Sequence, residues 1–267
     1  MAAAPAILSA LPLPSPSRIA TSSAEIAQLL EFPGIFKGHE LTRKDRYLSS
    51  GIAPLDRLLA GGIPRGRISE IVGAQSSGKT TLAASFAAAA ARRGEVIGWI
   101  DAAGAFDPRS IAEAGADLTR ILWLGFDPNA PANSTRRRRH SRELKAAELI
   151  LEAGGFGLLV IDFGALRFAL AQSASLRIAR AAERSATAVL VLAAGRMCGT
   201  FAALTLALER PRVSFSHNAP GAPALFDGIK FDAAVARSKL GIFGERVELY
   251  AAIDPHSTSW HRSRPGA

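Results

Sequence analysis

Residues 73–80 read Gly-Ala-Gln-Ser-Ser-Gly-Lys-Thr, which matches the phosphate-loop pattern G-x-x-x-x-G-K-[ST] at every fixed position. An apolar, β-branched segment, Ile68–Val72, precedes this loop, and an alanine-rich segment from Leu82 to Ala91 follows it. A strand, a glycine-rich loop and a helix in this order allow backbone N–H groups and the positive helix N-terminus to surround phosphate oxygens. The sequence therefore predicts a phosphate-binding loop within an α/β fold.

The side chains of this loop have separate expected roles. Lys79 would reach the β- and γ-phosphates of a nucleoside triphosphate, and the Thr80 hydroxyl would ligate Mg²⁺. Leu158–Asp162 is an apolar strand that ends in an acid, so Asp162 is expected to contribute to the same Mg²⁺ shell. The predicted nucleotide-binding set is Gly73, Gln75, Ser76, Ser77, Gly78, Lys79, Thr80 and Thr81.

The length of 267 residues and the hydrophobic content of 48% suit one α/β domain with appendages. We expect a basic N-terminal arm over residues 1–45, largely disordered with a short helix from Ser23 to Leu30, then a nucleotide-binding core over 46–255 and a flexible tail over 256–267. No apolar run is suited to span a bilayer, and the opening lacks the positive region of a secretory signal. The single cysteine, Cys198, excludes an internal disulfide, so a cytoplasmic protein without membrane contact is expected.

Strands and helix-length segments alternate through the predicted core, which indicates a mostly parallel sheet flanked by helices. The expected strands are Ile68–Val72, Val96–Asp101, Ile121–Leu124, Leu158–Asp162 and Thr187–Ala193, and the expected helices cover 79–92, 109–115, 142–153 and 171–184. Beyond them, Phe201–Leu208, Ile229–Arg237 and Arg246–Ile253 are separated by Gly/Pro turns. This change of pattern predicts antiparallel strands at the C-terminal edge of the sheet.

The chain resembles the RecA family at several motifs. These are Leu48-Ser-Ser-Gly51, Gly66–Gly73, the phosphate loop, Trp99–Pro108, Asp162 and, more weakly, Val235–Phe243. The resemblance runs with gaps from residue 46 to residue 253 and implies a RecA-like P-loop NTPase core with ATP and Mg²⁺ as cofactors.

One departure from the family concerns catalysis. In RecA the strand after the phosphate-loop helix ends Asp-Ala-Glu, and this glutamate positions the attacking water, whereas the present chain reads Asp101-Ala102-Ala103. General-base assistance is typically worth about 10²–10⁴-fold in rate, and alanine cannot supply it. We expect slow or absent ATP hydrolysis unless Asp101 or Asp107 substitutes. Ser110 also replaces the family's adenine-stacking aromatic residue, so adenine stacking is expected to be weaker.

Other departures concern DNA and neighbouring subunits. Asp162 is followed almost at once by a helix, and Ala193–Thr200 has no sensor glutamine and only a tight turn, so the family's long DNA-binding loops are missing and strand exchange is not expected. Arg237 and Lys239 fall where RecA has a Lys-x-Lys pair that reaches a neighbour's phosphates. They imply either a homo-oligomer with ATP at the interface or two solvated charges.

A basic run precedes the predicted helix 142–153 and consists of Arg136, Arg137, Arg138, Arg139 and Arg142. Adjacent arginines repel one another and oppose the helix dipole, so local stability does not explain them. With the formal net charge of +9, they favour contact with nucleic acid or an acidic partner. The alternative is a solvated surface loop.

The resemblance to ImuA-type accessory proteins includes Gly61-Gly62-Ile-Pro64-Arg-Gly66 and the shortened loops. It implies an ATP-gated scaffold of bacterial DNA repair and the SOS response, acting in translesion synthesis. The expected partners are DNA, directly or through another protein, and a recombinase filament or translesion polymerase components. One alternative is a diverged DNA-stimulated ATPase or recombinase. Another is a non-catalytic interaction module on the same fold.

Overall fold

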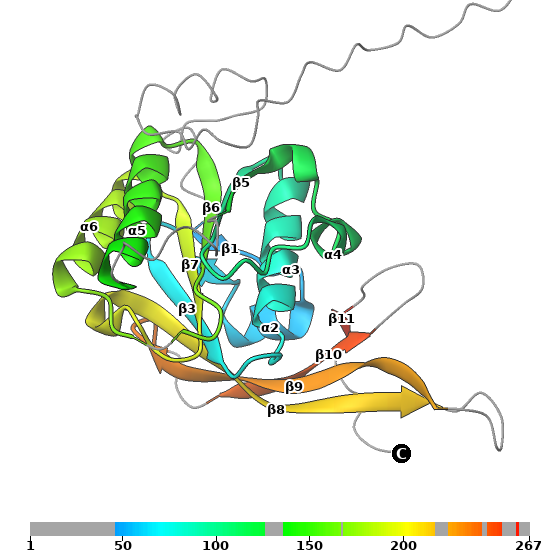
Figure 1. Cartoon of the computed structure of the whole chain (residues 1–267). Coiled ribbons are helices and arrows are strands. Elements are labelled where there is room, and N and C mark those ends of the chain that lie inside the picture. The colour runs from blue at the N-terminus through cyan, green and yellow to red at the C-terminus, as the bar shows by residue number, and fades with distance from the viewer. Residues whose placement is uncertain are drawn as a thin grey trace, which may run out of the picture.

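The computed structural model describes residues 46–125, 136–166, 168–216, 224–241, 245–252 and 260–261. The expected arm over 1–45, with its short helix, lies outside the described residues, as does most of the expected tail. The described part is built on a twisted nine-stranded sheet with the order β11-β10-β9-β8-β3-β7-β6-β4-β5 (Figure 1). The predicted α/β class, with a mostly parallel sheet and antiparallel strands at one edge, is confirmed.

The parallel part of the sheet contains the five strands expected from the sequence. They are β3 (Ile68–Gly73), β4 (Val96–Asp101), β5 (Ile121–Gly125), β6 (Phe156–Asp162) and β7 (Ala188–Ala193). Alternate residues of β6 face opposite layers, because Leu158 and Val160 join one apolar cluster while Leu159 and Ile161 join the other. Burial on both faces explains why the inner strands β6 and β7 are almost continuously apolar rather than alternating.

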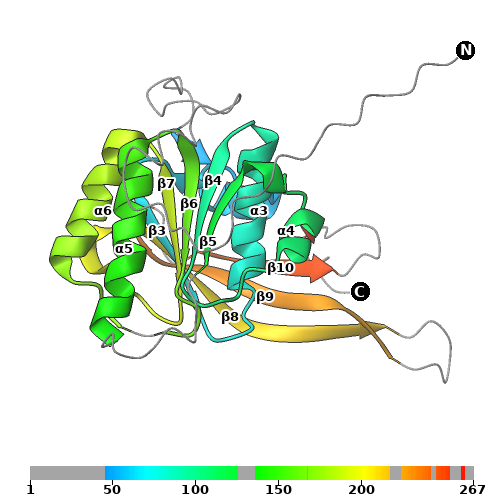
Figure 2. The same ribbon diagram turned by 45° about the horizontal axis from the view of Figure 1, so that its top comes forward.

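Helices cover both faces of the parallel strands (Figures 1 and 2). The short α2 (Ala53–Leu58), α3 (Lys79–Arg92) and α4 (Pro108–Glu113) contribute to one cluster. The helices α5 (Arg136–Ala153) and α6 (Gln172–Ser185) pack together on the opposite face and contribute to the other. None of the helices in the described part of the chain is long and apolar enough to span a membrane.

The basic run lies inside α5 rather than before it. The helix begins at Arg136, whereas the sequence predicted a helix over 142–153 preceded by the arginines. That prediction was wrong because the dipole penalty of a basic first turn is only about 0.3–1 kcal/mol per charge. Packing of the apolar residues further along α5, including Ala147 and Ile150 with no exposed surface, can outweigh it.

The C-terminal strands are longer than the sequence indicated. β8 (Ala202–Ser216) and β9 (Leu225–Ser238) form an antiparallel hairpin that projects beyond the helical layers, and β10 (Arg246–Ala252) pairs with β9 (Figure 2). Trp260–His261 forms the short strand β11, which pairs with β10. The sequence underestimated the hairpin because its outer half carries exposed and polar residues.

A small two-stranded sheet, β1 (Tyr47–Leu48) with β2 (Ile63–Pro64), closes the turn around α2. Asp56 organises this turn by accepting hydrogen bonds from the Ser49 hydroxyl (2.6 Å) and the Ser50 backbone N–H (2.7 Å). Gly62 has φ +129°, and a Cβ added there would lie 2.0 Å from the Leu48 carbonyl oxygen. The Ser-Ser-Gly and Gly-Gly sequences are therefore explained by a compact turn that supports the core. Two short 3₁₀ helices, η2 (Leu118–Arg120) and η3 (Gly199–Phe201), complete the described elements.

Candidate nucleotide-binding site

The phosphate loop connects β3 to α3 at the carboxyl end of the central strands. Gly78 precedes α3 with φ +88°, and a Cβ added there would lie 3.0 Å from the Phe231 ring of β9. A Cβ added to Gly73 would lie 2.5 Å from Ser77 Oγ. Both glycines are therefore required by close packing, which brings the backbone N–H groups of the loop to the start of the helix.

The Lys79 side chain folds back onto the phosphate loop. Its ammonium group donates hydrogen bonds to the carbonyl oxygens of Gly73 (2.9 Å) and Ala74 (2.7 Å). Burial lowers the pKa of Lys79, while the nearby Asp162 carboxylate partly opposes this shift. The ammonium thus has neutral carbonyl partners that an anionic phosphate oxygen can replace with a stronger, charge-assisted contact.

Asp162 reaches the same loop from the end of β6. Its carboxylate lies 3.4 Å from the Thr80 hydroxyl and accepts a hydrogen bond of 2.7 Å from the Gly164 backbone N–H. Burial raises the pKa of Asp162, and the neighbouring Asp101 carboxylate on β4 raises it further. A divalent cation would stabilise the ionised form that burial disfavours.

The residues present fit a Mg²⁺–triphosphate ligand. Thr80 and Asp162 supply the hard oxygen donors that Mg²⁺ prefers, and phosphate oxygens and waters normally complete such a shell. Ser77 Oγ is buried and has no hydrogen-bond partner among the described residues, so its hydroxyl could donate to a bound phosphate oxygen. No group of three or more His, Cys, Asp or Glu in the described ranges could hold a metal ion without phosphate.

Two carboxylates considered as substitute bases have structural partners. Asp101 is buried and accepts hydrogen bonds from the backbone N–H groups of Ala105 (2.9 Å) and Phe106 (3.0 Å). Asp107 caps α4, and hydrogen bonding from the Ser110 hydroxyl lowers the pKa of Asp107. Ala103 is exposed, and its methyl group would lie 2.8 Å from a Cβ placed on Gly164, two residues after Asp162. Position 103, where the resemblance to RecA predicts the catalytic glutamate, therefore faces the Asp162 loop but carries no base.

A cavity of about 510 Å³ adjoins the phosphate loop. Its lining comes from α3, from α4 with the loop before it, and from strands β9 and β10. The lining residues are Thr80, Thr81, Ala84, Ala105, Asp107, Ser110, Ile111, Glu113, Ala114, Phe226, Gly228, Ile229 and Ala251. Sequence reasoning found the loop residues of this cavity but missed those of β9 and β10, since only the strand register reveals them.

Comparison with known proteins agrees with this geometry. The model of the RecA N-terminal domain family matches residues 34–176. The chain belongs to the RecA family. Protein RecA of Clostridium beijerinckii is 34% identical over 125 residues, which cover 46% of the chain and 31% of that protein. Protein RecA of Rubrobacter xylanophilus is 36% identical over 126 residues, which cover 47% of the chain and 33% of that protein. The chain thus spans about a third of the length of these relatives.

A solved structure confirms the fold over more of the chain. The crystal structure of the RadB recombinase superposes with a TM-score of 0.54 and covers 76% of this chain and 96% of its own, at 19% identity. At this identity the likeness shows the fold alone. The RecA-family resemblance and fold predicted from the sequence are both confirmed, whereas the roles of individual site residues stay predictions.

The two segments expected to be shortened relative to RecA are short connections in this structure. Residues 163–171 link β6 to α6, and residues 194–201 link β7 to β8 through η3. The buried Glu70 of β3 fixes the second connection, accepting hydrogen bonds of 2.7 Å from the Met197 and Cys198 backbone N–H groups. Cys198 is buried there, and burial beside Glu70 raises the pKa of its thiol, so it is suited to packing rather than nucleophilic chemistry.

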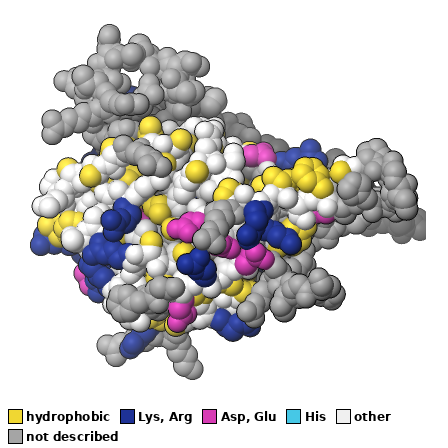
Figure 3. All heavy atoms as spheres, turned by 90° about the horizontal axis from the view of Figure 1, so that it is seen from below, with side chains coloured by type: hydrophobic (Ala, Val, Ile, Leu, Met, Phe, Trp, Pro, Cys, Tyr) yellow, Lys and Arg dark blue, Asp and Glu magenta, His cyan; other side chains and the backbone are white. Residues whose placement is uncertain are grey.

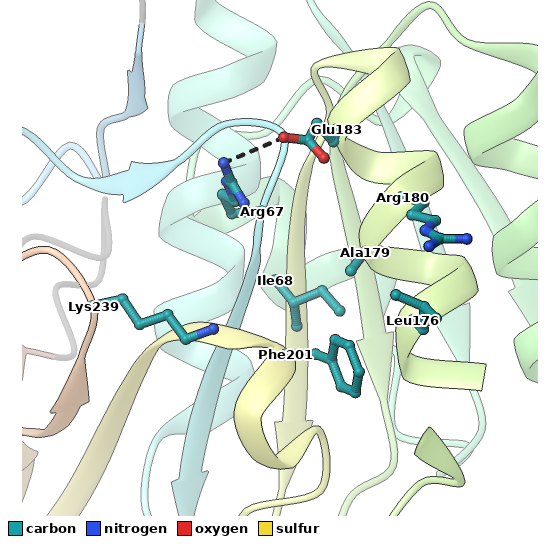
Figure 4. Close-up of a pocket in the computed structure, with 8 residues that line it drawn as sticks. All are labelled: Arg67, Ile68, Leu176, Ala179, Arg180, Glu183, Phe201 and Lys239. Atoms are coloured by element: carbon teal, nitrogen blue, oxygen red, sulfur yellow. Dashed lines mark ion pairs between the residues drawn. The ribbon is translucent and has the colours of Figure 1, made fainter. Parts of the chain in front are cut away.

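Arg237 and Lys239 lie at the opposite end of the sheet from the phosphate loop. Arg237 donates a hydrogen bond to the Gly199 carbonyl oxygen, and the exposed Lys239 lines a cavity of about 240 Å³ with Arg67 and Arg180 (Figure 4). Glu183, in the same cavity, is paired with Arg67 at 3.3 Å. The length of β3 separates Lys239 from its own loop by about 17 Å, at about 3.3 Å per residue, so contact with a phosphate would require a neighbouring subunit.

The five residues of the basic run lie in the first two turns of α5, and Arg142 is exposed. The side chains of Arg136 to Arg139 lie outside the described part of the structure. α5 and α3 cover opposite faces of the sheet (Figure 2). On the face seen in Figure 3, Lys and Arg side chains are interspersed with acidic ones, and no uniform basic surface is visible there.

Proposed function

We propose that this RecA-family protein binds Mg²⁺–ATP and acts as an ATP-gated accessory scaffold in bacterial DNA repair, with little or no hydrolysis. One observation carries the proposal: Lys79, Thr80 and Asp162 converge at an intact phosphate loop, while the neighbouring position expected to hold the base is Ala103. Binding groups are thus present where a catalytic group is missing.

Binding would use groups already close to their working positions. Loop N–H groups and Lys79 would hold the phosphates, and Thr80 with Asp162 would hold Mg²⁺, which supplies charge neutralisation when bound. The Lys79 ammonium would exchange two carbonyl partners for phosphate oxygens. Because the loop needs no new strand or helix to form, binding requires only local rearrangement.

Slow hydrolysis follows from the groups around the site. Asp101 and Asp107 already accept hydrogen bonds from their own loop and helix N-terminus. Using either as a base would break contacts that hold the neighbouring loop in place. ATP would therefore act by occupancy, stabilising one conformation of the protein rather than driving repeated turnover.

Titration of ATP with Mg²⁺ by isothermal calorimetry tests the binding claim. Lys79→Ala should weaken ATP binding at least 30-fold, since removing one partner of a buried charged contact costs about 2–5 kcal/mol. Lys145→Ala is the matched control, because Lys145 is exposed on α5 and pairs only loosely with Glu148 at 3.9 Å. Equal affinity in wild type and Lys79→Ala would contradict the proposal.

The proposed partners are DNA, directly or through another protein, and a recombinase filament or translesion polymerase components, as in ImuA-type proteins. The basic first turns of α5 support contact with a polyanion, because helix stability alone does not favour them. The reduced connections after β6 and β7 argue against strand exchange by this chain. A homo-oligomer in which Arg237 and Lys239 reach a neighbour's ATP is part of the same proposal.

A further inference from the structure

The cavity beside the phosphate loop changes in chemistry along its length. Thr80 and Thr81 line it next to the loop, whereas Ile229 and Phe226 of β9 line it from the hairpin. A ligand that spans it would combine a polyanionic end with a flat apolar end. A nucleotide has this combination, and the inference below therefore rests on the proposed ATP binding.

Phe226 faces this cavity because of an irregularity in the hairpin. Ile229 pairs with Val213 and Phe226 pairs with Phe215, so three steps along β9 oppose two steps along β8. The extra residue turns Phe226 to the same face as Ile229, which lines the cavity with it. In a regular strand, residues 226 and 229 would point to opposite faces.

Phe226 is also unusually exposed for a large aromatic side chain. Its relative exposure is 42%, and its ring lies 5.9 Å from that of Phe215, which is 58% exposed. Hydrophobic side chains gather beside the hairpin tip in the space-filling view (Figure 3). An exposed ring that lines a cavity offers a stacking surface for a planar ligand.

The opposite wall supplies no aromatic ring at the corresponding place. Position 110 is a serine whose hydroxyl hydrogen-bonds to Asp107, so this side chain is engaged in capping α4. Ile111 and Ala114 complete the apolar part of this wall. Phe226 is the only aromatic residue among those that line the described cavity.

We propose that Phe226, on the projecting hairpin, is the surface on which the base of the bound nucleotide stacks. The hairpin thereby takes part in nucleotide recognition, and nucleotide binding is linked to the position of β8 and β9. Stacking on an aromatic ring is tolerant of base identity. The residue should therefore contribute to affinity for ATP and GTP alike rather than select between them.

Affinity measurements on Phe226→Ala test this proposal, with Phe226→Tyr as the conservative variant and Phe215→Ala as the matched control. The probes are ATP, GTP and inorganic tripolyphosphate, each with Mg²⁺. Loss of a base–aromatic stack should weaken ATP and GTP binding by about 5- to 150-fold. Tripolyphosphate binding should be unchanged in Phe226→Ala, Phe226→Tyr should retain ATP affinity, and Phe215→Ala should lose no more than about threefold.

The outcomes separate this inference from the proposed function. Wild type that binds neither ATP nor tripolyphosphate would overturn both. Wild type that binds ATP normally, together with an unchanged affinity in Phe226→Ala, would overturn the stacking role alone. Equal losses for ATP and tripolyphosphate would also overturn it, because they would indicate distortion of the phosphate loop through β9.

Discussion

Charged side chains at the phosphate loop are held under conditions that disfavour their charge. Burial lowers the pKa of Lys79 and raises the pKa of Asp162. Groups in this condition reduce the stability of the free protein and gain a favourable partner when a ligand of opposite charge arrives. We expect a bound ligand to stabilise the charged forms of Lys79 and Asp162, which lower the stability of the ligand-free protein.

Asp162→Asn should therefore stabilise the nucleotide-free protein. A carboxyl whose folded pKa is raised favours the folded state below its unfolded pKa, and this contribution is lost as the pH rises through the folded value. At pH 7 the variant should have a higher Tm than wild type, and the difference should shrink as the pH falls towards 3.8, the ordinary value. Differential scanning calorimetry at several pH values measures this.

The same variant should lose the Mg²⁺ dependence of ATP binding. Wild type should bind Mg²⁺–ATP more tightly than ATP with EDTA, and this advantage should decline at acidic pH as Asp162 is protonated. Asp162→Asn should bind both forms alike. A lower Tm at pH 7 together with an intact Mg²⁺ effect would contradict the assigned role.

Ala103→Glu tests whether the missing base accounts for weak turnover. The new carboxylate would lie beside Gly164, near the Asp162 loop, and general-base assistance is worth about 10²–10⁴-fold. We expect ATP turnover to rise by about 10² or more in steady-state assays. Ala103→Gln is the matched control because it has similar size but no base, and comparable activation by both variants would argue against the explanation.

Among the elements, helix α5 begins with positively charged residues that lower its own stability. The first turn contains adjacent arginines although the N-terminus of a helix favours negative charge. Arg136→Glu combined with Arg137→Glu should raise the free energy of unfolding by about 0.5–2 kcal/mol. Urea denaturation measures this change, and a loss of stability would contradict the electrostatic account.

The same double variant should weaken DNA binding if the basic turn contacts phosphates. The affinity for single-stranded DNA should fall. The slope of log K against log salt concentration should decrease in magnitude by about one for each lost phosphate contact. Arg57→Glu with Arg109→Glu changes the net charge equally on the other face of the sheet. An equal loss in this control would show that only net charge matters.

The sequence predicted individual elements with unequal success. Strands 68–72 and 96–101 and the helix over 79–92 were correct within about one residue, because buried parallel strands and an alanine-rich helix have strong local signals. The start of α5 was missed because tertiary packing overrides the unfavourable first turn. The extent of the β8–β9 hairpin was missed because its outer part is exposed and carries little apolar alternation.

The whole molecule combines local motifs with long-range contacts, and only the motifs could be predicted from sequence. The phosphate loop and Asp162 were identified from spacing and flanking pattern, and the structure brings Thr80 within 3.4 Å of Asp162. The cavity wall from β9 and β10 was not, because it depends on strand register and on an irregular pairing near Phe226. A site built between distant strands leaves no contiguous signal in the chain.

The central claim is that the protein binds ATP but hydrolyses it slowly or not at all. The most direct test is ATP turnover by the full chain, with and without single-stranded DNA, using Lys79→Ala as the blank. The account predicts turnover indistinguishable from the blank in both conditions, although calorimetry detects ATP binding by wild type. Turnover well above the blank that rises with DNA would contradict the account and would support a diverged DNA-stimulated ATPase.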